Sequence, residues 1–257
     1  FSISVVGGGP TGVEMAGAFA ELVRGPLKND QAHAAAHIRI NLIEAGPRIL
    51  PMFSEKLSAR AKKDLEKLGV NVHLNTAVAE IKPRSIIVKN GDPIPSEVTI
   101  WAAGVKGEPT GGLLNLPLEG TRISVEQNLR VNNYPHIWAI GDISGAKDKA
   151  GRFLPMVAPV AMQQARWVAK QIMRANRGQV LQDFKYLDKG SMATIGRHKA
   201  VVQFKGIQIT GALAWFAWLW LHLFYLLGGR NKIGTIADWS WNYLTFDRGN
   251  RHIMDSQ

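Results

Sequence analysis

The chain has 257 residues, 46% of them hydrophobic, a formal net charge of +11 and no cysteine. This composition supports one large or two modest hydrophobic cores and excludes a disordered chain. Without cysteine, this stretch can hold no disulfide, iron–sulfur cluster or Cys-liganded zinc, so any redox chemistry here needs an organic cofactor, and no metal site is expected.

The first part of the chain alternates short apolar runs with helical patterns. Residues 2–6 form a β-type run that ends in glycines, and residues 13–24 have the pattern of an Ala-rich amphipathic helix. A second strand is predicted at 38–43, a helix at 57–68 and a third strand at 70–74. The order is βαβαβ, which predicts an α/β fold with a parallel sheet.

The middle of the chain continues with shorter elements. Residues 78–100 predict a hairpin and a returning strand, and residues 121–131 look extended. Residues 137–140 predict a buried strand, and a helix is expected from Ala158 to about Asn176. Residues 184–209 are again mostly strand-like. The alternation of strands and helices extends the α/β interpretation to the second half of the chain.

The glycine-rich turn after the first strand fits a dinucleotide-binding fingerprint. Gly7, Gly9 and Gly12 have the G-x-G-x-x-G spacing, in which the glycines permit a tight turn, a close pyrophosphate and close helix packing. Glu44 ends the second strand, where a carboxylate can hold ribose hydroxyls and repel the extra phosphate of NADP. NADH is therefore favoured over NADPH. Arg48, which lies nearby in the sequence, is a residue type that can instead bind the extra phosphate of NADP. The alternative is a glycine turn that merely joins strand to helix.

Several segments together resemble the type II NADH dehydrogenases, flavoproteins with two dinucleotide-binding domains. The segments are residues 5–14, 43–48, 101–104 and 137–142, of which the first, third and fourth recur broadly among such flavoproteins. The more specific ones are residues 186–197 and the Trp-rich stretch after them. The resemblance implies a Rossmann-type flavoprotein that binds NADH and FAD. Such proteins carry two glycine fingerprints, whereas this chain has one. We therefore expect a C-terminal fragment with an incomplete FAD-binding domain.

The resemblance also predicts three functional regions. Residues 1–106 would form the NADH-binding domain, and residues 107–182 the C-terminal part of the FAD-binding domain. Residues 183–257 would contribute C-terminal strands and amphipathic helices that anchor the protein to a membrane.

Two charged residues are the expected catalytic groups. By resemblance, Glu14 faces the nicotinamide and the flavin, and Lys189 points at the flavin and quinone, where a cation stabilises reduced, anionic flavin. Asp142 would bind the ribityl chain of FAD. The alternatives are a first-turn helix acid, a solvated lysine and a turn cap. The residues expected to bind NADH or FAD are Gly7, Gly9, Pro10, Thr11, Gly12, Glu44, Ala103, Gly104, Gly141, Asp142, Ala158, Pro159 and Lys189.

The segment that begins at Ala158 corresponds to the family's Ala-Gln-x-Ala-x-Gln motif beside the flavin and the quinone entrance. Pro159 replaces the first glutamine, and proline suits a first helical turn because its missing amide hydrogen would be unpaired there. Gln163 and Gln164 are the expected quinone contacts. Their alternative role is an exposed helix face.

The C-terminal third has the composition of a membrane-surface element. From Arg166 onward there are thirteen Lys or Arg against five Asp, a net charge of +8, and the remainder of +11 leaves +3 for the preceding residues. Residues 211–229 carry no formal charge and are rich in aromatic residues. A basic, aromatic segment favours an anionic membrane over nucleic acid as the partner.

We expect these helices to lie on one leaflet without crossing it, peripheral on the cytoplasmic face of the inner (plasma) membrane. The face expected to enter the lipid interface follows helical spacing, and a second aromatic segment spans residues 236–246. The alternative is a buried helix in a dimer interface, and a homodimer is an option. The expected interfacial residues are Trp215, Trp218, His222 and Tyr225 on the first segment and Trp239, Trp241, Tyr243 and Phe246 on the second, followed by Arg248 and Arg251.

The expected activity is transfer of a hydride from NADH to FAD and of two electrons on to a quinone, without proton pumping. Sulfide:quinone and disulfide reductases need redox cysteines, which this chain lacks. Soluble NADH:ferredoxin-type reductases share the first segments but not the Trp-rich tail. A membrane-tethered NAD-binding module without turnover is the alternative from another class.

Overall fold

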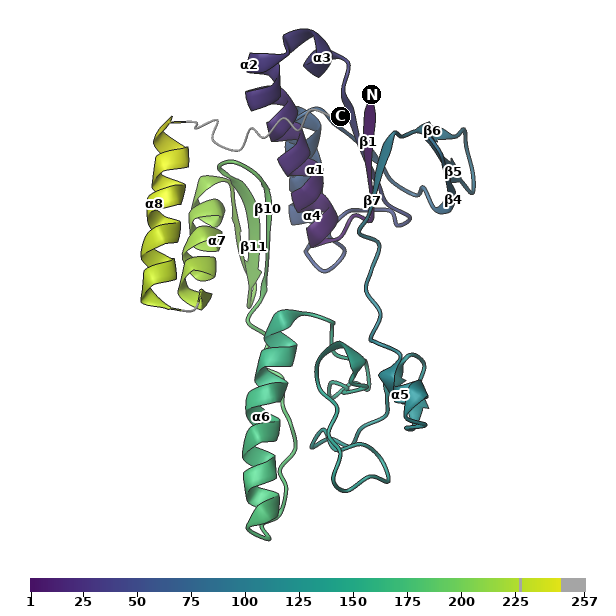
Figure 1. Ribbon diagram of the computed structural model, residues 1–257, viewed down its shortest axis with the longest axis vertical. Helices are drawn as coiled ribbons and strands as arrows, with labels where there is room; N and C mark the ends of the chain where they lie inside the picture. Colours follow the sequence, from purple (N-terminus) through teal and green to yellow (C-terminus); the bar gives the residue numbers. More distant parts are fainter. Residues whose placement is uncertain (227, 246–257) are drawn as a thin grey trace, which may run out of the picture. The chain divides into compact units, whose positions relative to one another are not determined.

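The computed structural model of the chain describes residues 1–226 and 228–245 (Figure 1). It forms two compact units, and each is described by itself. Unit 1 combines residues 1–103 with the chain from residue 190 onward, and unit 2 comprises residues 104–189. Unit 2 is therefore an insertion in the sequence of unit 1. The boundaries expected at residues 106 and 182 separate regions by the ligand they would bind. The boundaries between the two compact units lie after residues 103 and 189.

A four-stranded parallel sheet forms the centre of unit 1. Its strands are β1 (Ser2–Val6), β2 (Arg39–Ile43), β3 (Val70–His73) and β7 (Val98–Trp101), in the order β3-β2-β1-β7. The predicted parallel α/β sheet is thus confirmed. On one face, Val5 and Leu42 pack in a common core with α1 (Pro10–Leu22) and α4 (Glu55–Lys67). On the other, Val6 and Ile43 pack against the meander of β4 (Val78–Lys82), β5 (Ser85–Val88) and β6 (Ile94–Pro95).

Local sequence signals account for the positions at which α1 and α4 begin. Helix α1 begins three residues before the predicted Val13, because Pro10 fits a first turn and Gly9 supplies an extended N-cap. Helix α4 is capped by Ser54, whose hydroxyl oxygen accepts a hydrogen bond from the Leu57 amide at 3.3 Å. The segment between α1 and β2 is helical, with a π-helix at Val23–Leu27 followed by α2 (Lys28–Asp30) and α3 (Ala32–Ala36).

The C-terminal strands complete the core of unit 1. Strands β10 (Ser191–Gly196), β11 (Lys199–Phe204) and β12 (Ile207–Thr210) form an antiparallel sheet, followed by α7 (Ala212–Tyr225) and α8 (Gly229–Thr245). Helix α1 approaches β10 closely, since a Cβ atom on Gly17 would lie 2.0 Å from the Ile195 carbonyl oxygen. Ala193 and Ile195 are fully buried in the same core as the Rossmann sheet. A glycine at position 17 is therefore required for this docking.

Unit 2 contains little regular structure apart from one long helix. Helix α6 runs from Ala158 to Asn176, as predicted. The other elements are α5 (Thr110–Leu113), the two-residue strands β8 (Leu118–Glu119) and β9 (Arg122–Ile123), and the 3-10 turn η2 (Gly141–Ile143). The buried strand predicted at 137–140 is wrong, because in the described residues this segment makes only an isolated bridge between Trp138 and Arg130. Residues 129–131 lie beside it, but their backbone hydrogen bonds, from the Val131 amide to Ile137 and from the Ala139 amide to Leu129, do not extend into a continuous ladder.

Candidate functional site

Three glycines shape the turn between β1 and α1. Gly7 has a φ of +111°, and a Cβ there would lie 2.5 Å from the Ala102 oxygen, while a Cβ on Gly12 would lie 1.8 Å from the Gly7 oxygen. Gly9 differs, because nothing lies within 4 Å of its Cβ position. No side chain caps this end of α1. The open space beside Gly9 and the uncapped helix end form a cradle suited to the pyrophosphate of a dinucleotide.

Glu44 lies beside this turn, as the sequence predicted. Its carboxylate accepts hydrogen bonds from the backbone amides of Gly8, at 2.5 Å, and Gly46, at 2.6 Å. Ala103 also lies near, since the Ala103 nitrogen would be 2.7 Å from a Gly7 Cβ. Arg48 donates to the Pro51 oxygen at 3.0 Å. Unit 1 thus brings together the glycine turn, with Pro10 and Thr11 in the first turn of α1, and the acid expected to hold the ribose.

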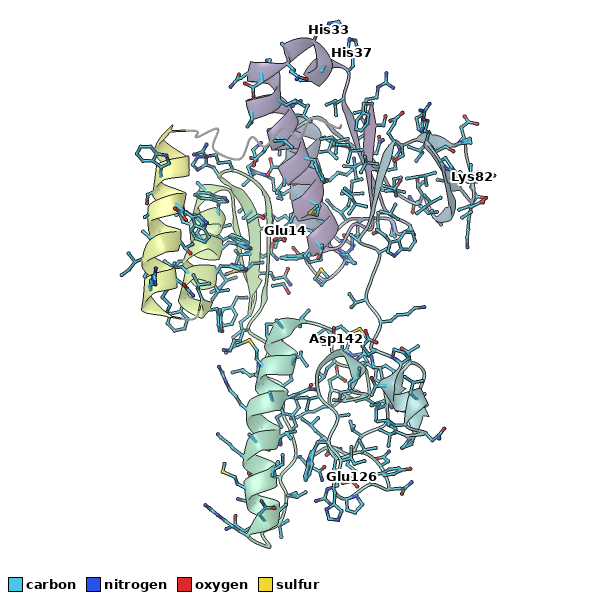
Figure 2. The ribbon with its side chains drawn as sticks, in the orientation of Figure 1. Glu14, His33, His37, Lys82, Glu126 and Asp142 are labelled. Atoms are coloured by element: carbon cyan, nitrogen blue, oxygen red, sulfur yellow. The ribbon has the colours of Figure 1, made fainter. Side chains whose placement is uncertain are left out.

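Glu14 makes a contact that sequence reasoning missed. Its carboxylate accepts a hydrogen bond from the Thr194 amide of β10 at 3.2 Å (Figure 2). Glu21, two turns further along α1, accepts one from the Arg197 amide. The two glutamates bracket Gly17 on one face of the helix and satisfy one backbone donor in β10 and one in the turn directly after it. The available signal was a pair of glutamates seven residues apart with a glycine between them. The role of Glu14 toward the nicotinamide stays a prediction.

Unit 2 brings together the residues expected at the flavin. Gly141 has a φ of +71° and precedes the exposed Asp142 in the turn η2. A Cβ on Gly141 would lie 3.7 Å from the Ala161 Cβ, so this turn abuts the first turns of α6, where Ala158 and Pro159 are exposed. No side chain caps the N-terminus of α6. An exposed carboxylate, a left-handed glycine and an uncapped helix end suit the polyol and phosphates of FAD.

The two glutamines expected to contact quinone both bind the protein's own backbone. Gln163 donates to the Leu187 oxygen and accepts from the Leu187 amide, each at 3.0 Å. The Gln164 side chain is only 1% exposed, and its oxygen accepts from the Gly141 amide at 2.7 Å. Lys189 is exposed, two residues after Leu187. A direct contact between quinone and either glutamine stays a prediction. The burial of Gln164 argues against such a contact by that residue.

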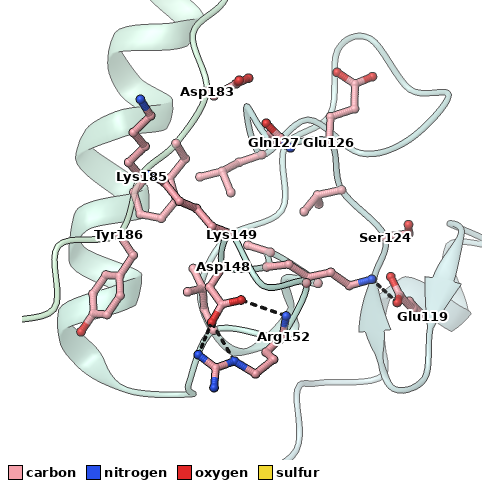
Figure 3. Close-up of a pocket in the computed structure, with 18 of the residues that line it drawn as sticks. Glu119, Ser124, Glu126, Gln127, Asp148, Lys149, Arg152, Asp183, Lys185 and Tyr186 are labelled. Atoms are coloured by element: carbon pink, nitrogen blue, oxygen red, sulfur yellow. Dashed lines mark hydrogen bonds and ion pairs between the residues drawn. The ribbon is translucent and has the colours of Figure 1, made fainter.

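A cavity of about 810 Å³ lies in unit 2, away from these residues (Figure 3). Its wall includes an ion pair of 2.8 Å between Arg152 and Asp148, and hydrogen bonds from the Arg152 backbone amide and then from the Arg152 side chain hold the pKa of Asp148 below its usual value. At Tyr186, burial and then the neighbouring charge of Asp188 raise the phenol pKa. None of the predicted site residues lines this cavity. Within the described residues, no three His, Asp or Glu side chains are grouped as metal ligands.

Helix α7 packs on the sheet of β10, β11 and β12, and α8 lies beside α7 (Figure 1). Both helices expose large apolar side chains. The predicted interfacial face of α7 is correct only in part, because His222 and Tyr225 are exposed whereas Trp215 and Trp218 are half-buried. Trp215 packs against a core cluster with Ala200 and Ala214, and Trp218 stacks on His222 at 3.8 Å between ring centroids. The sheet covers this side of the helix at Trp215. The outward face is made by Leu213, Phe216, Trp220 and Phe224, with Trp220 71% and Phe224 68% exposed.

Helix α8 also exposes apolar side chains, including Trp241 at 60%. The expected contributions of Phe246, Arg248, Arg251 and the Tyr243 side chain lie outside the residues whose placement the structure describes. Among the helices of the described part, none is both long enough and apolar enough to cross a membrane.

Comparison with known proteins defines the class. A family model of the pyridine nucleotide-disulphide oxidoreductases matches residues 2–165, and a model of the NDH2 C-terminal domain matches residues 189–248. The chain therefore belongs to the pyridine nucleotide-disulphide oxidoreductase family and, by its C-terminal domain, to the type II NADH dehydrogenases within it.

Individual relatives agree with this assignment. The chain is 36% identical to a type II NADH:quinone oxidoreductase of Mycobacterium tuberculosis, over 100% of this chain and 57% of that protein. It is 34% identical to a mitochondrial internal alternative NAD(P)H-ubiquinone oxidoreductase of Solanum tuberosum, over 91% and 51%. NDH2 of Plasmodium falciparum, solved with NADH, has the same fold, with a TM-score of 0.88 at 21% identity, covering 99% of this chain and 67% of that one. The chain thus spans about half the length of these curated relatives.

Proposed function

We propose that the complete protein is a membrane-associated NADH:quinone oxidoreductase that does not pump protons. The observation that carries this proposal is the cradle at Gly9 beside Glu44, built on the same compact unit as an NDH2-type C-terminal domain. When bound, FAD would take a hydride from NADH and return two electrons to a quinone. The relatives carry such activities in their names.

In this proposal the residues of unit 1 bind and orient NADH. The helix end at Gly9, with Gly7 and Gly12, receives the pyrophosphate, and Ala103, together with Gly104 at the start of unit 2, borders the nicotinamide. Glu44 is held by two backbone amides, so its remaining lone pairs are fixed in direction and can accept hydrogen bonds from ribose hydroxyls. Glu14 is held at Thr194 and would orient the nicotinamide or relay a proton.

The residues of unit 2 would hold the flavin and meet the quinone. Asp142 can accept hydrogen bonds from the ribityl hydroxyls, and Ala158 and Pro159 leave the start of α6 accessible to the ring. Lys189 supplies a cation that stabilises negative charge on the reduced ring and on the quinone. The quinone would enter near Lys189, Gln163 and Gln164.

The test is spectroscopic and uses the full-length protein. It should be yellow with a flavin absorbance spectrum, NADH added without oxygen should bleach that spectrum, and a short-chain quinone should restore it. NADPH is the matched control and should bleach it much more slowly. A protein that binds NADH but contains no flavin would instead be a membrane-tethered NAD-binding module without turnover.

We further propose that α7 and α8 lie in one leaflet, on the cytoplasmic face of the inner (plasma) membrane. The outward apolar face of α7 and the flanking cations Lys205, Arg230 and Lys232 suit the headgroup boundary of an anionic bilayer. A homodimer stays a prediction.

The absence of cysteine makes the topology testable, because single labels can be introduced by Thr210→Cys and Arg230→Cys. On sealed vesicles, an impermeant thiol reagent should reach both sites from the same side. Labelling from opposite sides would exclude the one-leaflet arrangement.

A further inference from the structure

Two neighbouring glutamines on α6 hold two segments that are far apart in the sequence. The side-chain amide of Gln163 donates to the carbonyl oxygen of Leu187 and accepts from the N–H of the same residue. It thus makes the same two hydrogen bonds with Leu187 that a residue of a neighbouring antiparallel strand would make. The Gln164 oxygen binds the Gly141 amide. Each tethered backbone position lies one or two residues before a group expected at the flavin, namely Lys189 and Asp142.

The segment that leads to Lys189 depends on such tethers. Residues 179–190 form no helix or strand, so no backbone ladder fixes them. Gln171, another buried residue of α6, accepts a hydrogen bond from the Gln182 amide at 2.8 Å, and the Phe184 amide donates to the Gln127 oxygen at 2.8 Å. Gln163 is the next attachment along this segment. Helix α6 therefore acts as a rigid support to which the extended chain is fastened by side-chain amides.

Glutamine is chemically suited to this task. An amide presents a donor and an acceptor on one planar group, so it can satisfy both the N–H and the C=O of a single residue. A carboxylate offers only acceptors at neutral pH, and leucine offers neither. An unpaired N–H at Leu187 would bind water instead, and the segment would gain conformational freedom.

We propose that Gln163 and Gln164 are positioning residues, Gln163 for Lys189 and Gln164 for Asp142, and that neither touches the quinone. This inference rests on the proposed function, because it assigns the tethered groups to the flavin. It replaces the expected quinone contacts with an indirect role that the observed hydrogen bonds already provide.

The tethers are tested by hydrogen exchange in the full-length protein, a measurement that needs no turnover. Gln163→Leu should speed exchange at the Leu187 amide by about tenfold and leave the Gly141 amide unchanged. Gln164→Met, of similar volume, should do the reverse and lower the retention of flavin. Gln163→Glu keeps the acceptor for the Leu187 amide and should give intermediate exchange. Gln179→Leu, at an exposed position beyond the end of α6, is the control and should change neither.

The link to Lys189 is tested by a double-mutant cycle on quinone reduction, followed by stopped flow. Lys189→Met should slow flavin reoxidation by quinone more than flavin reduction by NADH. Gln163→Leu should slow the same step, leave the KM for quinone unchanged, and add nothing in the Lys189→Met background.

Each contrary result has a distinct meaning. Unchanged exchange at Leu187 would overturn the tether. Faster exchange with a raised KM and additive losses would show that Gln163 contacts the quinone directly, and would overturn the positioning role. Failure of NADH to reduce the flavin of the wild-type protein would contradict the proposed function, while the exchange measurements would still decide the tethers.

Discussion

The two units hold their proposed ligand-binding segments by different means. In unit 1, the glycine turn and Glu44 follow directly from strands of a paired sheet, and buried apolar side chains cover both faces of that sheet. In unit 2, the turn at Gly141 and the segment before Lys189 are fastened to one helix by glutamine side chains. Unit 1 should therefore be sensitive to changes of volume, and unit 2 to the loss of single hydrogen bonds.

The largest expected effect is a cavity in the core of unit 1. Leu42→Ala removes a fully buried side chain between the sheet and its helices, and should cost about 2–5 kcal/mol of unfolding free energy. Leu129→Ala, equally buried in the smaller core of unit 2, should cost less because its loop-rich surroundings can collapse into the space. Native-state hydrogen exchange, read on peptides of each unit, measures both. Equal losses would remove the contrast between the units.

A second pair of variants separates the folding role of the glycine turn from its binding role. Gly12→Ala places a Cβ against the Gly7 oxygen and should cost about 1–3 kcal/mol of stability, together with NADH binding. Gly9→Ala meets no protein atom within 4 Å, so stability should change by no more than about 0.5 kcal/mol. NADH affinity should nonetheless fall by about tenfold, because the methyl group fills the space of the pyrophosphate. Calorimetric titration and thermal melts provide the comparison, and unaltered affinity in Gly9→Ala would disprove the cradle.

Glu44→Gln tests whether an acid at the end of β2 sets nucleotide preference. The amide would keep one acceptor but direct a donor at the Gly8 or Gly46 amide, so the ratio of NADH to NADPH efficiency should fall about tenfold. Glu55→Gln, exposed on α4, is the matched control. The measurement is kcat/KM for each nucleotide in the complete enzyme, and an unchanged ratio would show that Glu44 does not select the ribose.

The smallest effect concerns a polar contact between two neighbouring strands of the sheet in unit 1. His73 lies with its Nε2 3.3 Å from the Asn41 Oδ1, and burial lowers the pKa of His73 from its ordinary value of 6.5. The unfolded chain therefore binds this proton more readily. Its contribution to stability is present above pH 6.5 and is lost as pH falls through the lowered pKa. His73→Gln should flatten that part of the stability curve, and His33→Gln, on exposed α3, should not. Identical curves for both variants would exclude His73 as the titrating group.

Sequence patterns predicted unit 1 better than unit 2, for a physical reason. The parallel strands and the glycine turn are local features with strong periodicity, and Glu44 follows from its place at a strand end. The ends of α6 were also predicted correctly, because Pro159 and the following amphipathic pattern define them. The segment at 137–140 has the same apolar composition as a buried strand, but composition does not reveal that its pairing with residues 129–131 stops at an isolated bridge.

The missed features all depend on contacts between distant residues. Helical spacing grouped Trp215, Trp218 and His222 correctly on one side of α7, but could not reveal that the sheet covers that side at Trp215. The contact between Glu14 and Thr194 joins residues 180 positions apart, and the pairing of Gln163 with Leu187 joins a helix to an irregular segment. From the sequence alone, a glutamine on a helix is interpreted as a solvated surface residue, because its hydrogen-bond partner is not known.

The insertion of unit 2 within unit 1 has a consequence for synthesis of the chain. The dinucleotide-binding core needs Ala193 and Ile195 against α1, yet these residues follow all of unit 2 in the sequence. At about 5–20 residues per second, the ribosome needs roughly 5–20 s to make the stretch between β7 and β10. Unit 2 emerges from the exit tunnel before β10 does, and until then the face of α1 around Gly17 lacks the strand that covers it. The order of folding is then the reverse of the order in which the two units begin, and that exposed face is where a chaperone would bind the nascent chain.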